Sequence, residues 1–193
     1  MKVGDYFKLG HYSQNNGDVK EPIEWLVLDV SGDEALLISR YGLDCKQYHS
    51  ENVETTWEEC DLRKWLNNDF LEVAFSDEER KKIKVSNLKN NDNSEFENCG
   101  GNSTEDQVFC LSIAEAKQYF KNDKARQCQP TSSLAKQHRL FIKDGYCGWL
   151  LRSPSREQSV WVVYVDGSIC LGSYPNDVND GAVRPAIRII CNQ

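Results

Sequence analysis

Cysteine and histidine are the residue types in this chain most able to act as nucleophiles or metal ligands. Late in the chain, Cys147 and His138 form the one close pair of this kind, and such a pair could provide a thiol nucleophile with an imidazole base. The sequence shows no third group that would orient the imidazole. We therefore favour a packing role for Cys147 at the start of a strand, and keep a thiol- or metal-dependent enzyme as the alternative.

The spacing of possible metal ligands argues against a metal centre. The chain has no Cys-x-x-Cys motif, and His11, His49 and His138 are too far apart for the usual structural zinc patterns. Four Asn and Asp side chains within residues 176–180 could offer oxygen atoms to Ca²⁺, but their spacing differs from that of an EF-hand loop. We interpret this segment as a solvated loop, and we expect no metal and no cofactor.

The eight cysteines are scattered along the chain, and several lie within apolar patterns, as Cys110 does. A buried free thiol in such a position behaves as a small hydrophobic group. An even number of cysteines would suit a secreted disulfide framework, but residues 1–6 show none of the apolar character of a secretory signal. We therefore expect reduced thiols and favour a cytoplasmic location.

Composition limits the classes of partner. The chain has 193 residues, 39% of them hydrophobic, which suits a single domain over residues 1–193. Its formal net charge is −7, and residues 51–80 hold ten acidic against three basic side chains. Such a surface repels a phosphate backbone, so nucleic acid is not an expected partner. No apolar run approaches the roughly 20 residues of a membrane span, so we expect no membrane insertion.

The clearest local signal for structure lies near the C-terminus. Residues 159–165 form a run of β-branched and aromatic side chains, and residues 168–171 follow it across an Asp-Gly dipeptide. This pattern predicts a hairpin with a two-residue type I′ turn. Its register places four side chains on the core face: Val162, Tyr164, Ile169 and Leu171. The register then places Trp161 over Gly172 on the opposite face.

That opposite face and the loops beside it form the candidate ligand-binding surface, which consists of Arg156, Trp161, Tyr174, Asn176, Asp177 and Asn179. Tyrosine and tryptophan offer contact area at low entropic cost, and Asn and Asp offer adaptable hydrogen bonds. The same residue types also form turns, so a solvated loop without a ligand stays open as an alternative. For Trp161, the alternative is a ring that covers the bare backbone of Gly172.

Other elements can be predicted from caps and periodicity. Residues 23–30 and 34–39 predict a central hairpin, and residues 183–191 predict a last strand that closes the sheet. Three capping boxes begin at Thr56, Ser76 and Ser112. The first and third predict helices over residues 57–67 and 113–120. Residues 89–106 are rich in Asn, Asp, Ser and Gly and predict a long surface loop that buries little.

Two arginines in apolar strands, Arg152 and Arg184, need a carboxylate or carbonyl partner inside the fold. We expect a structural role for both, rather than anion binding.

Several motifs follow one another along the chain. They are EPIEWLVL at residues 21–28, TTWE at 55–58, LRKWLN at 62–67, WLLRSP at 149–154 and VRPAI at 183–187. Together they resemble an uncharacterised domain family of Firmicute bacteria, of unknown function. The final Trp strand, hairpin and Arg-Pro strand also resemble C-type-lectin-like domains, including formylglycine-generating enzymes and tropism determinants diversified by retroelements. This resemblance implies an α+β fold with a twisted, mixed or antiparallel sheet, two main helices and long loops, and it is an analogy of fold.

These observations favour a non-catalytic recognition module that binds a protein or other ligand. The alternative is a thiol- or metal-dependent enzyme related to folds of the formylglycine-generating type.

Overall fold

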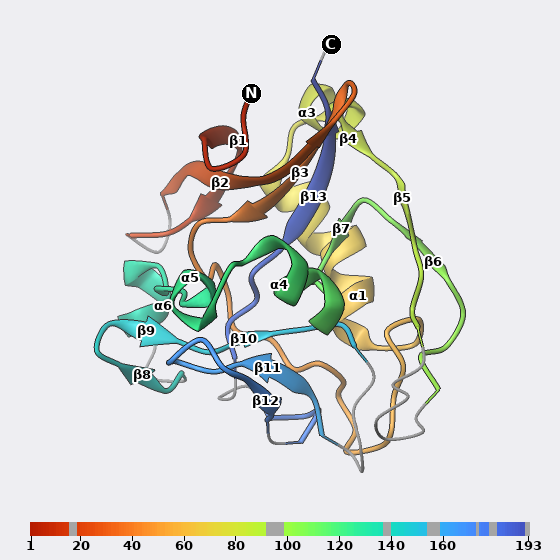
Figure 1. Ribbon diagram of the computed structural model, residues 1–193, viewed down its shortest axis with the longest axis vertical. Coiled ribbons are helices and arrows are strands. Elements are labelled where there is room, and N and C mark those ends of the chain that lie inside the picture. The colour runs from red at the N-terminus through yellow and green to blue at the C-terminus, as the bar shows by residue number, and fades with distance from the viewer. Residues whose placement is uncertain are drawn as a thin grey trace.

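The computed structural model describes residues 1–15, 19–91, 99–136, 140–153, 159–172, 174–177 and 181–191. Its largest sheet has the strand order β1-β2-β3-β13-β4, and β7 also pairs with β13. These strands are β1 (Tyr6–Ser13), β2 (Lys20–Ser31), β3 (Glu34–Ser39), β4 (Ile83–Lys84), β7 (Val108–Phe109) and β13 (Ala186–Ile190). Figure 1 shows this sheet at one end of the molecule. Together with the helices described below, it confirms the expected α+β class.

Smaller antiparallel sheets occupy the rest of the molecule. They pair β5 (Ser86–Leu88) with β6 (Thr104–Asp106), β8 (Ile142–Lys143) with β9 (Tyr146–Cys147), and β11 (Trp161–Val163) with both β10 (Trp149–Leu150) and β12 (Ile169–Leu171). The C-type-lectin-like character of this arrangement stays a prediction.

The hairpin of β2 and β3 forms as its sequence predicts. Ser31 pairs with Glu34, and Gly32 in the turn between them has a φ of 61°, which glycine adopts without a clash at Cβ. Strand β3 is buried over nearly its whole length because it lies between β2 and β13. The expected closing strand is therefore confirmed, and it belongs to the same sheet as β2.

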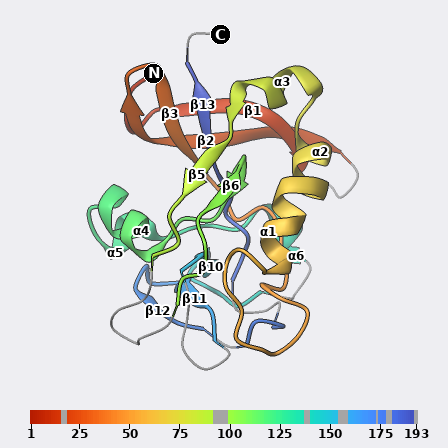
Figure 2. The same cartoon turned by 90° about the vertical axis from the view of Figure 1, so that its right-hand side faces the viewer.

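One continuous helical run covers the sheet: α1 (Asp61–Trp65), the π-helical turn η1 (Leu66–Phe70) and α2 (Leu71–Ala74). Figure 2 shows this run along one side of the molecule. The predicted start at residue 57 is wrong, because Cys60 caps the helix with its thiol and Thr56 does not. Residues 57–59 form a turn instead. That turn directs Trp57 into the core, where its ring is fully buried.

The other two capping boxes are confirmed. In both, the serine side chain accepts from the backbone N–H three residues on, and the glutamate accepts from the serine N–H. They open α3 (Asp77–Lys82) and α4 (Ile113–Tyr119), and the remaining helices are α5 (Asp123–Arg126) and α6 (Ser132–Lys136).

The segment expected to be a long surface loop contains a buried carboxylate at its end. Asp106 in β6 is 1% exposed. It accepts hydrogen bonds from Trp57 Nε1 at 2.9 Å, Arg63 Nε at 2.7 Å and Thr104 Oγ1 at 2.8 Å. The prediction that this segment buries little is therefore wrong at Thr104 and Asp106, because the Asp106 carboxylate joins β6 to α1 and to the turn before it.

The C-terminal hairpin has a register that differs by one residue from the predicted one. Trp161 pairs with Leu171, and the loop has three residues rather than two. Gly167, with a φ of 88°, donates its N–H to Tyr164 O at 2.9 Å, and Tyr164 N–H donates to Ser168 O at 2.7 Å. This is a type I turn followed by a glycine bulge, the usual three-residue hairpin loop.

The new register changes which side chains are buried. Tyr164 and Leu171 were expected in the core, but each is 40% exposed. All three residues of β11 are buried instead. Since neighbouring residues of a strand point to opposite faces, β11 is covered on both sides. Trp161 therefore lies inside the fold.

Arg152 finds the internal partners that the sequence predicts for it. Its Nη1 donates to Cys110 O at 2.9 Å and to the carboxylate of Glu115. Glu115 also accepts from the N–H of Ser112 at 2.8 Å. This carboxylate therefore joins the start of α4 to the segment after β10, which carries Arg152.

Lowering the pH is expected to weaken this contact. Burial opposes ionisation of Glu115, but the charge and hydrogen bond of Arg152 and the Ser112 amide outweigh it and hold the pKa below its ordinary value of 4.5. The stabilisation is thus complete above pH 4.5 and is lost as the pH falls through the lowered pKa. At neutral pH, Glu115→Gln should lower the free energy of unfolding by about 2 kcal/mol, and the difference from the parent should shrink in acid.

Urea unfolding at a series of pH values measures this difference. Glu72→Gln, at an exposed position on α2, is the matched control and should show little change. If the free energies of unfolding of the parent and of Glu115→Gln differed by the same amount at neutral and at acid pH, the prediction would be contradicted.

Candidate functional site

The structure separates the residues of the predicted binding surface. Trp161 is only 8% exposed and belongs to the core, so its expected place on an open face is wrong. Tyr174 is 56% exposed, Asn176 is exposed and Asp177 is half-buried. Arg156 and Asn179 lie outside the described residues. The structure therefore brings together only one turn of the predicted surface.

That turn, residues 174–177, is held against the segment before α1. Asp177 N–H donates to Tyr174 O at 2.9 Å. Gln47 Nε2 donates to Asn176 O at 2.6 Å, and His49 N–H donates to Pro175 O at 3.1 Å. The exposed Tyr174 ring therefore stands on a fixed backbone.

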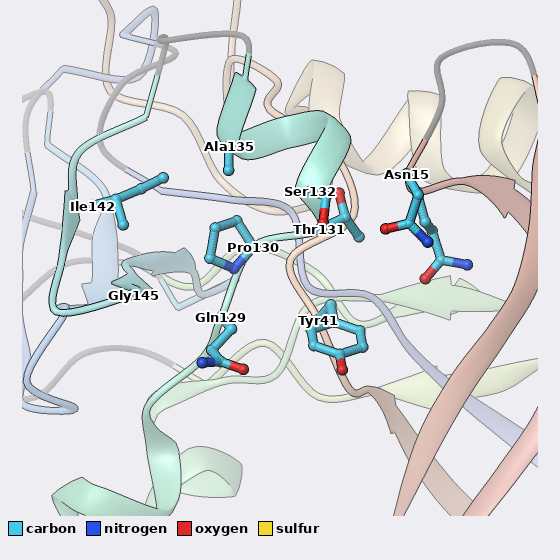
Figure 3. A pocket seen from close by; sticks show the side chains of 10 residues that line it. Asn15, Tyr41, Gln129, Pro130, Thr131, Ser132, Ala135, Ile142 and Gly145 are labelled. Atoms are coloured by element: carbon cyan, nitrogen blue, oxygen red, sulfur yellow. The ribbon is translucent and has the colours of Figure 1, made fainter.

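A pocket lies elsewhere, where four parts of the chain meet (Figure 3). Its volume is about 430 Å³, within the range of about 300–1,000 Å³ that is usual for small-molecule sites. The described residues that line it are Gln14, Asn15, Tyr41, Gln129, Pro130, Thr131, Ser132, Ala135, Ile142 and Gly145. They come from the end of β1, the segment after β3, the segment that leads into α6, and the β8–β9 hairpin.

The pocket has two chemically different ends. Figure 3 shows Pro130, Ala135, Ile142 and Gly145 toward one end, with Gln129 below Pro130, and Asn15, Tyr41, Thr131 and Ser132 toward the other. The first group is largely apolar, and the second offers amide and hydroxyl groups. None of the described lining residues carries a charge. The pocket therefore suits a group with one apolar part and one uncharged polar part.

Hydrogen bonds hold the pocket walls in place. Gly42 N–H donates to Gln129 O at 3.0 Å, and Thr131 N–H donates to Gly42 O at 3.0 Å. Thr131 Oγ1 then accepts from Leu134 N–H at 3.3 Å in the first turn of α6. Ser133 N–H donates to Gln14 O at 2.7 Å, which joins α6 to the end of β1. These bonds fix the backbone on both sides of the pocket before any ligand binds.

Some polar side chains in the pocket are free to contact a ligand. Within the described part of the chain, the Tyr41 hydroxyl and the side chains of Gln129 and Ser132 have no hydrogen-bond partner. Gln14 is already engaged, because its Nε2 donates to Glu21 O and Pro22 O, each at 3.0 Å. Sequence reasoning missed this site because its lining residues come from segments far apart in the chain. The one local signal was the Pro-Thr-Ser start of α6.

The thiol and imidazole pair suggested by the sequence cannot be assembled from the described residues, since His138 lies outside them. Cys147 is fully buried in β9, in agreement with a packing role. In the parts of the chain that the structure describes, no three His, Cys, Asp or Glu side chains are grouped to hold a metal ion. None of the helices there has the length and apolar character needed to cross a membrane.

Fold and site together define an α+β protein with a small pocket whose described lining residues carry no charge. Residues 32–190 match the model of a family described as a domain of unknown function, DUF6273, and the chain belongs to that family. No curated protein and no solved structure matches the chain significantly. Membership of an uncharacterised domain family was expected from the motifs, whereas the Firmicute origin stays a prediction.

Proposed function

We propose that this protein is a non-catalytic recognition module, and that its pocket binds an uncharged, peptide-like segment of a protein or other ligand. The observation that carries the proposal is the pairing of free amide and hydroxyl groups, on Gln129, Ser132 and Tyr41, with the apolar end formed by Pro130, Ala135 and Ile142. A peptide unit offers the same combination, because its amide donates and accepts hydrogen bonds and its side chain can be apolar.

Charge supports the choice of an uncharged ligand. A charged group that leaves water must find a counter-charge or pay a large desolvation penalty, and none of the described lining residues offers one. The net charge of −7 further disfavours polyanions such as nucleic acid. The pocket volume of about 430 Å³ admits one or two amino-acid side chains rather than a folded partner.

The surface predicted from the sequence keeps a smaller part in this proposal. Tyr174 and Asn176 are exposed on a fixed turn and offer a second contact area for a larger ligand. The resemblance of the chain end to C-type-lectin-like domains agrees with recognition as a class of function, but an analogy of fold does not identify the ligand.

The first test is a titration with two small probes, N-acetyl-leucine amide and N-acetyl-aspartic acid α-amide. Both present amide groups, but the second also carries a carboxylate. The leucine probe should shift the backbone amide NMR signals of Gln129 and Thr131, and the aspartate probe should shift them much less. Equal shifts with both probes, or none with the leucine probe, would argue against the proposed site.

A substitution that fills the pocket provides the matched variant. Ala135→Phe directs a ring into the cavity and should abolish the shifts caused by the leucine probe. Val73→Phe is the control, because Val73 is exposed on α2 and does not line the pocket. Thermal unfolding of both variants checks that each retains the fold. Undiminished binding by Ala135→Phe would place the ligand elsewhere.

A further inference from the structure

Two buried cysteines face each other next to the pocket. Cys128 precedes the wall residue Gln129, and Cys147 pairs with the wall residue Ile142. The two cysteines form an antiparallel bridge, in which Cys147 N–H donates to Cys128 O at 2.8 Å. Opposed residues in such a bridge have Cα atoms about 4.5–5.5 Å apart, which lies within the span of about 4.4–6.8 Å that a disulfide requires.

The bridge also places the two side chains on one side of the paired segments. Directly opposed residues of an antiparallel pair project their side chains to the same face, with Cβ atoms about 4.5–5.5 Å apart. A small local adjustment is therefore enough to bring the two sulfur atoms to bonding distance.

A buried cation lies beside the pair. Arg184 is 3% exposed, and its guanidinium donates to Ser39 O at 3.0 Å and to Arg126 O at 3.4 Å. It also lies 5.1 Å from the centre of the Trp149 ring. The carbonyl partners confirm the expectation from the sequence. In the part of the chain that the structure describes, however, no carboxylate forms an ion pair with this guanidinium.

A buried cation without a carboxylate favours a nearby anion. Burial alone raises the pKa of the Cys128 thiol, but the hydrogen bond from Cys147 and the charge of Arg184 together lower it below its ordinary value. The same hydrogen bond raises the pKa of Cys147. Gln129 O, 3.4 Å from the Cys128 sulfur, favours the protonated form, but a weak S–H bond is outweighed by a full charge. Of the two thiols, Cys128 is therefore the one that ionises more readily.

We propose that Cys128 and Cys147 form a peroxide-sensitive dithiol that closes reversibly to a disulfide beside the pocket. The Cys128 thiolate attacks one oxygen of hydrogen peroxide, the O–O bond breaks, and hydroxide leaves. The Cys147 sulfur then attacks the resulting sulfenic acid, and the S–OH oxygen leaves as water with the Cys147 proton. In sum, a thiolate, a thiol and one peroxide give one disulfide, one water and one hydroxide. A dithiol reductant reverses the step by thiol–disulfide exchange.

The cross-link joins two walls of the pocket. One cysteine lies in the segment that carries Gln129 and Pro130, and the other lies in the β8–β9 hairpin that carries Ile142 and Gly145. The pair is independent of what the pocket binds, so failure of the binding proposal leaves this inference open to its own test.

Two further cysteines serve as a comparison. Cys60 and Cys110 are both fully buried. Burial is the main influence on both, and it raises the pKa of Cys60 to about 12 and also raises that of Cys110. A thiolate is the species that reacts with peroxide. Because the pKa values of both thiols are raised, neither forms much thiolate at neutral pH, and we expect this second pair to stay reduced.

The experiment oxidises the folded Cys99→Ser protein with a small molar excess of hydrogen peroxide, since the exposed Cys99 would otherwise link chains together. The protein is then unfolded, alkylated with iodoacetamide and digested for mass spectrometry. Peptides with Cys128 and Cys147 should appear linked and two hydrogens lighter, while Cys60 and Cys110 are alkylated in full. Dithiothreitol should restore every thiol.

Two variants separate the steps. Cys147→Ser should stop at a Cys128 sulfenic acid that dimedone labels, and Cys128→Ser should leave Cys147 reduced. Full alkylation of both cysteines after oxidation of the parent, or linkage of Cys60 to Cys110 at the same rate, would overturn the proposal. Oxidation of the Cys99→Ser protein alone distinguishes these outcomes. The test therefore remains valid even if Cys147→Ser or Cys128→Ser folds poorly.

Discussion

Replacing Asp106 by alanine is expected to lower the free energy of unfolding by about 3–5 kcal/mol. The carboxylate is 1% exposed and accepts from the Trp57 indole and the Arg63 guanidinium. Without it, a buried indole N–H loses its acceptor and a partly buried cation loses its counter-charge. Chemical denaturation of the variant and the parent measures the loss.

Glu105→Ala is the matched control for this variant. Glu105 precedes the buried carboxylate in β6, but its side chain is exposed. Its removal should change the free energy of unfolding by less than about 0.5 kcal/mol. If Asp106→Ala lost no more than this control, the carboxylate would not be the link between β6 and α1 that its hydrogen bonds indicate.

Gly167→Ala is expected to destabilise the protein by about 2–5 kcal/mol. A Cβ atom there would lie 1.8 Å from Asp123 O, and the backbone has a φ of 88°. Helix α5 and the hairpin loop cannot move apart easily to relieve this clash, because Arg126 Nε donates to Gly167 O at 2.9 Å and so joins them. Urea unfolding of the variant gives the size of the effect.

The control separates the backbone conformation from the contact. Gly32 also has a positive φ, of 61°, but a Cβ atom there would meet nothing within 4 Å. Gly32→Ala should therefore cost only the conformational part, about 1 kcal/mol. Equal losses at the two positions would show that packing against α5 does not contribute at Gly167.

Local patterns predicted those elements that local interactions determine. The turn at Gly32 and the capping boxes at Ser76 and Ser112 involve residues within four positions of one another, and all three formed as predicted. The box at Thr56 has the same spacing but does not begin a helix. There a distant residue, Asp106, binds the Trp57 indole, and a local pattern contains no information about that contact.

The predicted register of the C-terminal hairpin was wrong for the same reason. An Asp-Gly dipeptide fits a two-residue loop and also a three-residue loop with a glycine bulge. Contacts of Gly167 with α5, far away in the sequence, accompany the longer loop. The shift by one residue moved Tyr164 and Leu171 toward solvent, whereas β11, which carries Trp161, is covered on both faces.

The candidate site was the least predictable part. The binding surface predicted from residue types required the loop residues near the hairpin to share one exposed face with Trp161. Trp161 is buried, so this surface lacks its central residue. The pocket depends instead on contacts among the end of β1, the segment after β3, the α6 region and the β8–β9 hairpin. No periodicity or motif links these segments, so only the folded chain shows that Gln14 and Ile142 line one cavity.

The position of β13 has a consequence for how the chain folds. This strand pairs with β3 on one edge and with β4 and β7 on the other, so the last strand along the sequence lies inside the largest sheet (Figure 1). During synthesis β3 emerges long before its partner, and its unpaired edge stays open to other chains until residue 190 has left the ribosome. Pairing of such distant strands is slow because loop closure precedes the contacts that reward it. The nascent protein therefore passes through a sheet with a gap, and this is the stage at which it is most exposed to aggregation.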